Sequence, residues 1–465
     1  MAGRHFLVAG IVLLATILLP FFSGQAWAAG DLPPRSASLA KARVTWEDMP
    51  GAVAYRVAIL EKETDSPQKA LKTYRAVYAP GLEFPTEWLG EKAATAFWTV
   101  AGFDRDGNPV GEWQKPSPLR DAETQLMAPL PIDEYDRMAY LPVYPVYAWL
   151  AVPRASSYEV EVWRRQDDGR EERARHYYSY ETILYETVPF TQAGAYWWRV
   201  RALDGNGRRY SDWSVPRAMT VTAPTPIAAL GDSITHGGGA CSTPPCRQIY
   251  NWETYCSVPV KNIGVSGDSP EAMCERFETD VLPFAPQVLV IMGGVNDYRV
   301  GLPADDSIYY LNRIAEKCQQ NGITPVFVTA TPIHPALMAR LEEIEPVAEN
   351  WQAEQRRLNE WIRSQPHAID ITASLTDETG RLRQEMTSDG LHPDYLAKKS
   401  MGETIGAYLT ANFPEAVRAA RENAAAISPE NPATGPAAKK RPYPGRKHHQ
   451  NNGCGQCGSS KKAAA

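Results

Sequence analysis

The chain has 465 residues, and 44% of them are apolar, which is enough to bury several cores and predicts two to four domains. Its formal charge is only -6 at pH 7. An imbalance this small does not indicate a nucleic-acid partner or binding to an anionic membrane surface. Composition therefore favours a multidomain globular protein.

The first residues predict a secretory signal peptide over 1–28. Arg4 and His5 precede an apolar run over 6–22, and the segment ends in Ala26-Trp27-Ala28, a small-residue cleavage pattern. The run is also about long enough to span a bilayer, so an uncleaved membrane anchor is the alternative. We expect an exported protein, periplasmic or extracellular.

Between residues 40 and 222 the sequence repeats itself. In each copy a Trp precedes a Tyr by nine residues, and a later Trp precedes an Asp by six residues and another Trp by fifteen. The two sets are Trp46, Tyr55, Trp98, Asp104 and Trp113, and Trp149, Tyr158, Trp198, Asp204 and Trp213. Alternating strands follow each Tyr, and Asp106-Gly107 and Asn206-Gly207 are hairpin signals. The pattern predicts two all-β sandwiches.

These copies resemble fibronectin type III modules, which carry a Tyr-x-Val after an early Trp and a closing Trp-Ser-x-Pro. Trp213-Ser214-Val215-Pro216 fits this pattern, and Trp113-Gln114-Lys115-Pro116 fits less well. We place the modules at 31–127 and 128–222. The resemblance implies a spacer or a docking module whose aromatics form the sandwich cores. A polymer-binding face at the Tyr-rich run 177–180 is the alternative.

From residue 223 the pattern changes to apolar strands that alternate with helical stretches. Strands are predicted over 227–231, 260–264, 287–292, 323–330 and 368–372. Helices are predicted over 247–257, 270–281, 304–321, 336–364 and 393–412. This alternation implies right-handed crossovers and a parallel sheet covered on both faces, so we expect an α/β three-layer domain over 223–415. Functional loops in such sheets lie at the carboxyl ends of the strands.

Four short motifs lie at those strand ends or just before the last helix. They are Gly231-Asp232-Ser233-Ile234, Asn262-Ile263-Gly264-Val265-Ser266-Gly267-Asp268, Gly293-Gly294-Val295-Asn296-Asp297 and Asp389-Gly390-Leu391-His392-Pro393. In order, spacing and context they resemble the SGNH (GDSL) hydrolase family over 227–412. The resemblance implies a flavodoxin-like sheet and a serine esterase. The Gly-x-Ser-x-Gly elbow of the α/β-hydrolase fold is absent at Ser233.

The residue types in these motifs suit acyl transfer. Ser233 would be the nucleophile, because a hydroxyl becomes reactive when a neutral imidazole accepts its proton. His392 is the candidate base, and Asp389, three residues earlier, would orient the imidazole. The resemblance implies an oxyanion hole formed by the backbone N–H groups of Ser233 and Gly267 and by the side-chain amide of Asn296.

Three further polar residues are candidates to line the substrate site. His236 is close to Ser233 in sequence, although we expect a histidine in this loop to lie on the surface. His334 follows another strand and is expected to line the pocket, and Asp297 is expected to form hydrogen bonds beneath the site. No cluster in this domain has metal-ligand spacing, and the reaction needs no cofactor.

The seven cysteines divide between the third domain and the tail. Cys241 and Cys246 could close a small loop, or all five cysteines of the domain (Cys256, Cys274 and Cys318 are the others) could be reduced. The tail, 416–465, is basic and rich in Ala, Pro, Gly and Lys, and it loses apolar periodicity past Ile427, so we expect it to be disordered. It would contact an anionic envelope surface or, through Cys454 and Cys457, a metal.

Taken together, these patterns predict an exported serine esterase with two accessory modules. We expect an ester substrate, first an acylated polysaccharide from which small acyl groups such as acetate are removed, and second a lipid, as in a lysophospholipase. The alternative of another class is a non-catalytic envelope adhesion protein with a vestigial hydrolase domain. The oligomeric state is not predicted.

Overall fold

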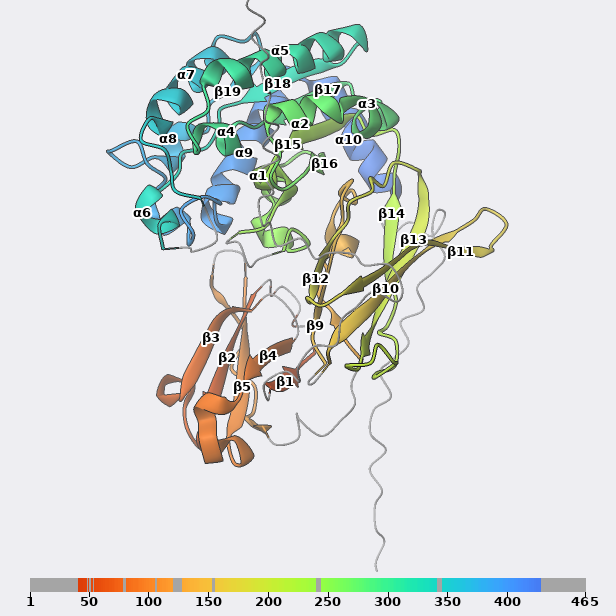
Figure 1. Cartoon of the computed structure of the whole chain (residues 1–465), viewed down its shortest axis with the longest axis vertical. Coiled ribbons are helices and arrows are strands. Elements are labelled where there is room, and N and C mark those ends of the chain that lie inside the picture. The colour runs from red at the N-terminus through yellow and green to blue at the C-terminus, as the bar shows by residue number, and fades with distance from the viewer. Residues whose placement is uncertain are drawn as a thin grey trace, which may run out of the picture.

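The computed structural model describes residues 41–427 except 48, 50–51, 53, 78–80, 105–106, 120–127, 153–154, 240–243 and 341–344. Figure 1 shows two antiparallel β units, red to orange and yellow, and an α/β domain coloured green to blue. The predicted signal peptide and most of the predicted tail lie outside the described residues. Among the described residues, no helix combines the length and apolarity needed to cross a membrane.

The first β unit has two antiparallel sheets. One pairs β1 with β4, and the other has the order β3-β2-β5-β6, with β7 pairing β5. The strands are β1 (Lys41–Thr45), β2 (Ala54–Leu60), β3 (Lys72–Val77), β4 (Gly81–Pro85), β5 (Phe97–Phe103), β6 (Pro109–Val110) and β7 (Ser117–Pro118). Short 3-10 helices, η1 (Pro67–Lys69) and η2 (Glu87–Ala94), connect some of them. This unit has its own hydrophobic core.

The second β unit also has two antiparallel sheets, in the orders β11-β10-β13-β14 and β12-β9-β8. Its strands are β8 (Leu130–Pro131), β9 (Val146–Leu150), β10 (Ser157–Arg165), β11 (Glu171–Ser179), β12 (Ile183–Tyr185), β13 (Gly194–Leu203) and β14 (Arg217–Val221). The 3-10 turn η4 (Tyr135–Arg137) lies between β8 and β9.

Equivalent contacts in the two units confirm the predicted repeat. The Tyr55 hydroxyl accepts a hydrogen bond from the backbone N–H of Met49 at 3.2 Å, and Tyr158 accepts one from Val152 at the same distance. Each Tyr ring packs edge-on against the preceding Trp, with centroids 5.2 Å apart in the first unit and 5.3 Å in the second. The spacing of the aromatics therefore encodes the same interior twice.

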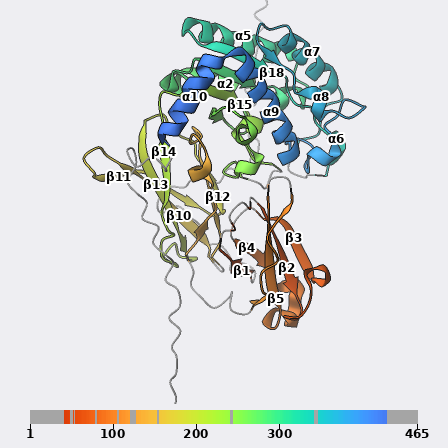
Figure 2. The same cartoon turned by 180° about the vertical axis from the view of Figure 1, so that it is seen from behind.

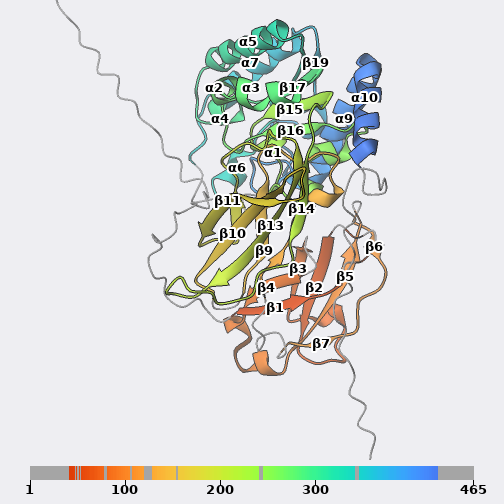
Figure 3. The same cartoon turned by 90° about the vertical axis from the view of Figure 1, so that its right-hand side faces the viewer.

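The α/β domain is built on a five-stranded parallel sheet in the order β16-β15-β17-β18-β19. Its strands are β15 (Ile227–Gly231), β16 (Lys261–Gly264), β17 (Val288–Met292), β18 (Thr324–Val328) and β19 (Ala368–Ile369). Its helices are α1 (Ser233–His236), α2 (Pro270–Glu275), α3 (Phe277–Asp280), α4 (Val295–Tyr298), α5 (Ala304–Gln320), α6 (Pro335–Met338), α7 (Trp351–Arg363), α8 (Thr372–Leu375), α9 (Tyr395–Asn412) and α10 (Pro414–Ile427). Figure 3 shows the sheet between a layer containing α2, α5 and α7 and a layer containing α9 and α10. The predicted parallel sheet with helices on both faces is confirmed.

The second β unit and the α/β domain share one hydrophobic core. Buried residues from Tyr135 to Ala420 form a single continuous cluster, whereas the first unit's core is separate. Seen from behind in Figure 2, α10 lies beside the second unit at β14. The Tyr140 hydroxyl donates to the carbonyl of Ala420 in α10 at 3.2 Å. The second unit is therefore joined to the α/β domain over an interior, not through a linker alone.

Two helical predictions and the start of the predicted tail need correction. Residues 336–364 form two separate helices, α6 and α7, because Pro346 lies between them and cannot continue a helix. The stretch 247–257 forms only the 3-10 turns η5 (Gln248–Tyr250) and η6 (Trp252–Tyr255), because Asn251 between them has an extended backbone, with φ -100° and ψ 123°. The predicted disordered tail begins too early, since 414–427 form α10.

The cysteines are reduced where the structure describes them. Cys246, Cys256, Cys274 and Cys318 are free thiols, and Cys246 is fully buried. The structure therefore does not contain the Cys241–Cys246 bridge, although Cys241 itself lies outside the described residues. Cys454 and Cys457 also lie outside them.

Candidate active site

The candidate nucleophile lies on a tight turn at the end of the buried strand β15. Asp232 is the N-cap of α1, and its carboxylate accepts the backbone N–H of Ile234 at 2.9 Å. Gly231 has no room for a side chain, since a Cβ there would lie 2.5 Å from the carbonyl oxygen of Met292 in the neighbouring strand. This packing presents Ser233 at the carboxyl edge of the sheet, where the sequence places it.

Ser233, His392 and Asp389 form a continuous hydrogen-bonded chain across 159 positions of sequence. The Ser233 Oγ lies 3.0 Å from His392 Nε2, and His392 Nδ1 lies 2.8 Å from an Asp389 carboxylate oxygen. Because the carboxylate accepts from Nδ1–H, the lone pair of Nε2 faces the serine hydroxyl. Ser233 keeps 8% of its surface exposed, so the hydroxyl is confined by its surroundings.

The Asp389 carboxylate is held ionised by its loop. Burial would raise its pKa, but the charge and hydrogen bonds of His392, together with the backbone N–H groups of Leu391 and His392, outweigh burial and lower the pKa to about 2. Those N–H groups donate to the carboxylate at 2.9 and 2.8 Å. Thr387 closes the loop by accepting the N–H of Gly390 at 2.9 Å. The carboxylate is therefore charged over the whole neutral range.

The loop after β16 brings the predicted oxyanion donors beside the nucleophile turn. The N–H of Val265 donates to the carbonyl of Gly231 at 3.0 Å. Gly267 has φ +93°, a conformation that favours glycine. The Asn296 amide donates to the carbonyl of Asp268 at 2.9 Å, which ties the third motif to this loop. The structure thus gathers Ser233, Gly267 and Asn296 at one edge of the sheet.

His236 is not on the surface, contrary to our expectation. Its side chain is 2% exposed, with Nε2 2.7 Å from the carbonyl of Tyr144 and Nδ1 3.0 Å from Ser266 Oγ. Gly264 permits this position, because a Cβ there would lie 2.2 Å from the backbone nitrogen of His236. The imidazole is therefore an interior hydrogen-bonding group rather than one free to line the substrate site.

Asp297 and His334 lie at two other strand ends. Asp297 is buried and accepts the hydroxyl of Ser307 at 2.6 Å, so it joins α4 to α5 beneath the site, and burial raises its pKa. The backbone N–H of His334 donates to the carbonyl of Gly390 at 2.7 Å, next to the catalytic loop. Its half-buried side chain has an Nδ1 without a hydrogen-bond partner among the described residues.

Two buried charged groups near the nucleophile were not predicted. Asp232 is 1% exposed, and burial raises its pKa to about 7. Lys398 is fully buried in α9 and donates to the carbonyl of Ile234 at 2.6 Å, which holds the helix beneath the nucleophile turn. A signal for Lys398 was present, because Gly402 and Gly406 follow it at four-residue intervals and mark the close-packed face of the helix.

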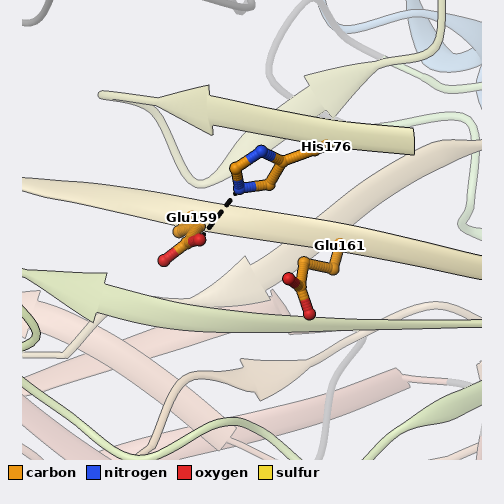
Figure 4. Close-up of side chains that lie close together, drawn as sticks. All are labelled: Glu159, Glu161 and His176. Atoms are coloured by element: carbon orange, nitrogen blue, oxygen red, sulfur yellow. Dashed lines mark hydrogen bonds and ion pairs between the residues drawn. The ribbon is translucent and has the colours of Figure 1, made fainter. Parts of the chain in front are cut away.

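A group with metal-ligand chemistry lies in the second β unit, far along the chain from Ser233. The ligand atoms of Glu159, Glu161 and His176 all lie within 4.8 Å of one another (Figure 4). Arginines already pair with both carboxylates: Arg201 with Glu159 at 2.6 Å, and Arg199 and Arg173 with Glu161 at 2.6 and 3.1 Å. A cation would have to displace these guanidinium groups, so we assign the group as an ion-pair network on the sheet.

Residues 229–397 match the GDSL-like lipase/acylhydrolase family. A relative, the uncharacterized lipoprotein YqeF of Bacillus subtilis (strain 168), is 30% identical over 122 residues, or 23% of this chain. The chain spans about half of that relative's length, 49%. The C-terminal region is thus a GDSL-like lipase/acylhydrolase domain, and the chain carries a hydrolase domain of this family.

Solved structures resemble the same region. The lipase/acylhydrolase from Enterococcus faecalis is 18% identical, with a TM-score of 0.33 over 40% of this chain and 96% of that chain. A GDSL-like lipase from Bacteroides thetaiotaomicron is 19% identical, with a TM-score of 0.32 over 40% and 89%. An acetyl xylan esterase is 16% identical, with a TM-score of 0.30 over 39% and 98%.

Proposed function

We propose that the protein is a serine esterase that hydrolyses carboxylic esters with Ser233, His392 and Asp389. The observation that carries the proposal is the hydrogen-bonded chain of 3.0 and 2.8 Å from the serine hydroxyl through the imidazole to a buried carboxylate. The orientation of the imidazole suits proton transfer from the serine, because the basic lone pair of His392 Nε2 faces the Ser233 hydroxyl.

The reaction would proceed in two steps. In the first, His392 Nε2 takes the Ser233 proton as Oγ attacks the ester carbonyl, and the same proton then goes to the departing alkoxide, which leaves an acyl-enzyme and an alcohol. In the second, water gives its proton to His392 and attacks the acyl-enzyme, which releases the carboxylic acid and restores Ser233. Asp389 stabilises the imidazolium in both steps.

The negative charge that develops on the carbonyl oxygen would be bound by N–H groups. We assign these to the backbone of Ser233 and Gly267 and to the Asn296 amide. The links from the 265–268 loop to Gly231 and to Asn296 support this assignment. Loss of one such donor typically lowers turnover about a hundred- to a thousand-fold.

For the substrate we favour acylated carbohydrate, with removal of acetyl or other small acyl groups, over a lipid. This choice rests on the leader pattern of 1–28, which favours export, and on two accessory β units, which we propose are of fibronectin type III type. Partly exposed aromatics on the second unit support it: the rings of Trp163 and Trp197 stack at 5.5 Å on one sheet face, beside Trp213.

The test compares two serine variants on a series of esters. The panel is p-nitrophenyl esters from acetate to palmitate, followed by acetylated xylan and by phospholipids. We expect Ser233→Ala to lose about 10⁴-fold or more in kcat, because the nucleophile is gone. Ser364→Ala is the control, since this exposed hydroxyl at the end of α7 contacts its neighbours Trp361 and Gln365 and lies outside the candidate site.

A fluorophosphonate probe separates an enzyme from an adhesion protein with a vestigial hydrolase domain. The probe should label the wild-type protein at Ser233 and fail to label Ser233→Ala. Absence of labelling and of turnover on every ester in the panel would reject the esterase and favour the adhesion protein. Faster turnover of long-chain esters and phospholipids than of acetylated xylan would replace the carbohydrate substrate with a lipid.

A further inference from the structure

The second β unit reaches the hydrolase domain through a short segment before β9. Residues 141–145 lie along β16, where the N–H of Val143 donates to the carbonyl of Asn262 at 3.0 Å. The ammonium group of Lys261, fully buried, donates to the carbonyl of Leu141 at 2.6 Å. Tyr144 follows in this segment and is itself buried. Two hydrogen-bonded routes lead from Tyr144 to the loop that follows β16.

The first route runs through His236. The carbonyl of Tyr144 can only accept, so His236 Nε2 carries the hydrogen that it accepts at 2.7 Å. His236 Nδ1 is then an acceptor, and it faces two donors of Ser266, the hydroxyl at 3.0 Å and the backbone N–H at 3.3 Å. Tyr185 of the same β unit packs its ring edge-on against the imidazole. The imidazole therefore links the β unit directly to the residue before Gly267.

The second route runs through two buried carboxylates and an arginine. The Tyr144 hydroxyl donates to Asp280 at 2.8 Å, and Arg276 donates to the same carboxylate at 3.0 Å. Arg276 also donates to Asp268 at 2.5 Å and to the carbonyl of Gly231 at 3.1 Å. This route ends on the residue after Gly267 and on the strand that carries the nucleophile.

Both routes end on the same short loop, one on each side of Gly267. The carbonyl of Asp268 also holds the Asn296 amide. We propose that Tyr144 and His236 are positioning residues for the oxyanion hole, so that the second β unit forms part of the catalytic apparatus. The proposal rests on the esterase function proposed above. It differs from the spacer or docking role expected for such a module.

The protonation state of His236 suits a fixed hydrogen-bonding role between Tyr144 and Ser266. Burial lowers its pKa to about 4, and the nearby charges of Arg276 and Lys398 act in the same direction. The imidazole therefore stays neutral near pH 7 and keeps one donor and one acceptor, as both contacts require. A shift of the loop by about 1 Å would misalign the Gly267 N–H, and misplacement of that size can cost about a hundred-fold in rate.

The test uses Tyr144 and Tyr140, four residues apart, as a matched pair. Tyr144→Phe and Tyr140→Phe each remove one hydroxyl that bonds to the hydrolase domain, but the Tyr140 hydroxyl bonds to Ala420, away from the oxyanion loop. We expect Tyr144→Phe to lower kcat about ten- to a hundred-fold with KM nearly unchanged, and Tyr140→Phe to leave kcat unchanged. Both should shift the Tm by similar amounts.

A double-mutant cycle with Asn296→Ala shows whether the effect passes through the oxyanion hole. If it does, Tyr144→Phe should cost much less kcat in the Asn296→Ala background, because part of what it misplaces is already absent. A purely structural loss would cost the same factor in both backgrounds. Likewise, His236→Asn, whose amide oxygen can accept from Ser266, should recover part of the kcat that His236→Ala loses.

The outcomes separate the two proposals. If the wild-type protein neither turns over the ester panel nor reacts with fluorophosphonate, the esterase function fails and this inference fails with it. If the wild type is active but Tyr144→Phe has the kcat of Tyr140→Phe, only the positioning role is overturned. Should Tyr144→Phe not fold, equal kcat values for His236→Asn and His236→Ala would overturn it as well.

Discussion

The two β units contain the same interior but relate differently to the rest of the molecule. In both, a Tyr hydroxyl accepts a backbone N–H six residues upstream and its ring packs against a Trp. The first unit closes over a core of its own, whereas the second shares one continuous core with the hydrolase domain. A hydrogen bond from the Arg43 guanidinium to the carbonyl of Ala128 joins the first unit to the second.

The two β units therefore share a repeated sequence pattern but differ in how they are joined to the hydrolase domain. Trp98 is half-buried, whereas its counterpart Trp198 is fully buried and donates to Asp133 at 2.7 Å. The Trp198 ring packs on Tyr147 and Trp149 of its own unit, and this core continues into that of the hydrolase domain. The first unit is an appendage, and the second is one half of a larger folding unit.

The largest expected effect comes from deleting the units in turn. A chain that starts at residue 128 should fold and keep the esterase activity proposed for the full chain, since the core over 135–420 stays whole. A chain that starts at 223 should be insoluble, because each large side chain removed from the shared core contributed about 1.5–3 kcal/mol and a domain's total stability is only about 5–15 kcal/mol. Soluble expression and ester turnover measure both. An active chain starting at 223 would remove the distinction between the units.

Substitution of the equivalent tryptophans should give a smaller and graded contrast. We expect Trp198→Ala to cost about 3–5 kcal/mol, because it leaves a cavity in the shared core and removes one of the donors to the buried Asp133 carboxylate, with Arg217 remaining. Loss of activity in urea should then move to lower concentration together with loss of circular dichroism. Trp98→Ala should move only the transition of the first unit. If both variants lower the midpoint for activity equally, the first unit is also coupled to the hydrolase domain.

The smallest effect is a pH dependence at the joint between the second unit and the hydrolase domain. His236 has a folded-state pKa of about 4, below its ordinary value of 6.5. The unfolded chain therefore takes up a proton between these values that the folded chain does not, and stability falls as pH drops from 6.5 to 4. A gap of this size corresponds to about 3 kcal/mol.

Asp232 acts in the opposite sense, since burial raises its pKa to about 7, so the wild-type profile alone does not isolate His236. The measurement is the difference in unfolding free energy between the wild type and His236→Asn, by urea titration at pH 7 and pH 4.5. The deficit of the variant should shrink by about 2–3 kcal/mol at the lower pH. A deficit that is the same at both pH values would contradict a neutral buried imidazole.

Much of the fold and of the candidate site follows from local sequence patterns. The five strands of the hydrolase sheet were placed because short apolar runs alternate with helical stretches, and chain polarity then puts their polar ends at one edge. Ser233, Asp389, His392, Gly267 and Asn296 all come from such strand ends or loops. The aromatic spacing likewise predicted the repeated β interior.

The positions that the sequence misjudged are those whose neighbours come from distant parts of the chain. The sequence predicts that His236 lies in an exposed loop. It is buried, and its Nε2 is hydrogen-bonded to the carbonyl of Tyr144, 92 positions away. Residues 416–427 fall within the predicted disordered tail, yet Val417 and Ala420 are buried against the domain. The helical spacing of Val417 and Ala420 is a local signal for α10, whereas no local pattern marks His236 as buried.

The sequence by itself determined the order of strands and turns and the chemistry of the residues at their ends, because both depend on short-range pattern and residue type. Only the tertiary structure decided that the second β unit shares one core with the hydrolase domain and is linked by hydrogen bonds to the loop around Gly267. That outcome depends on contacts between segments more than a hundred positions apart, such as Tyr144 with Asp280, and these leave no signature in any one segment.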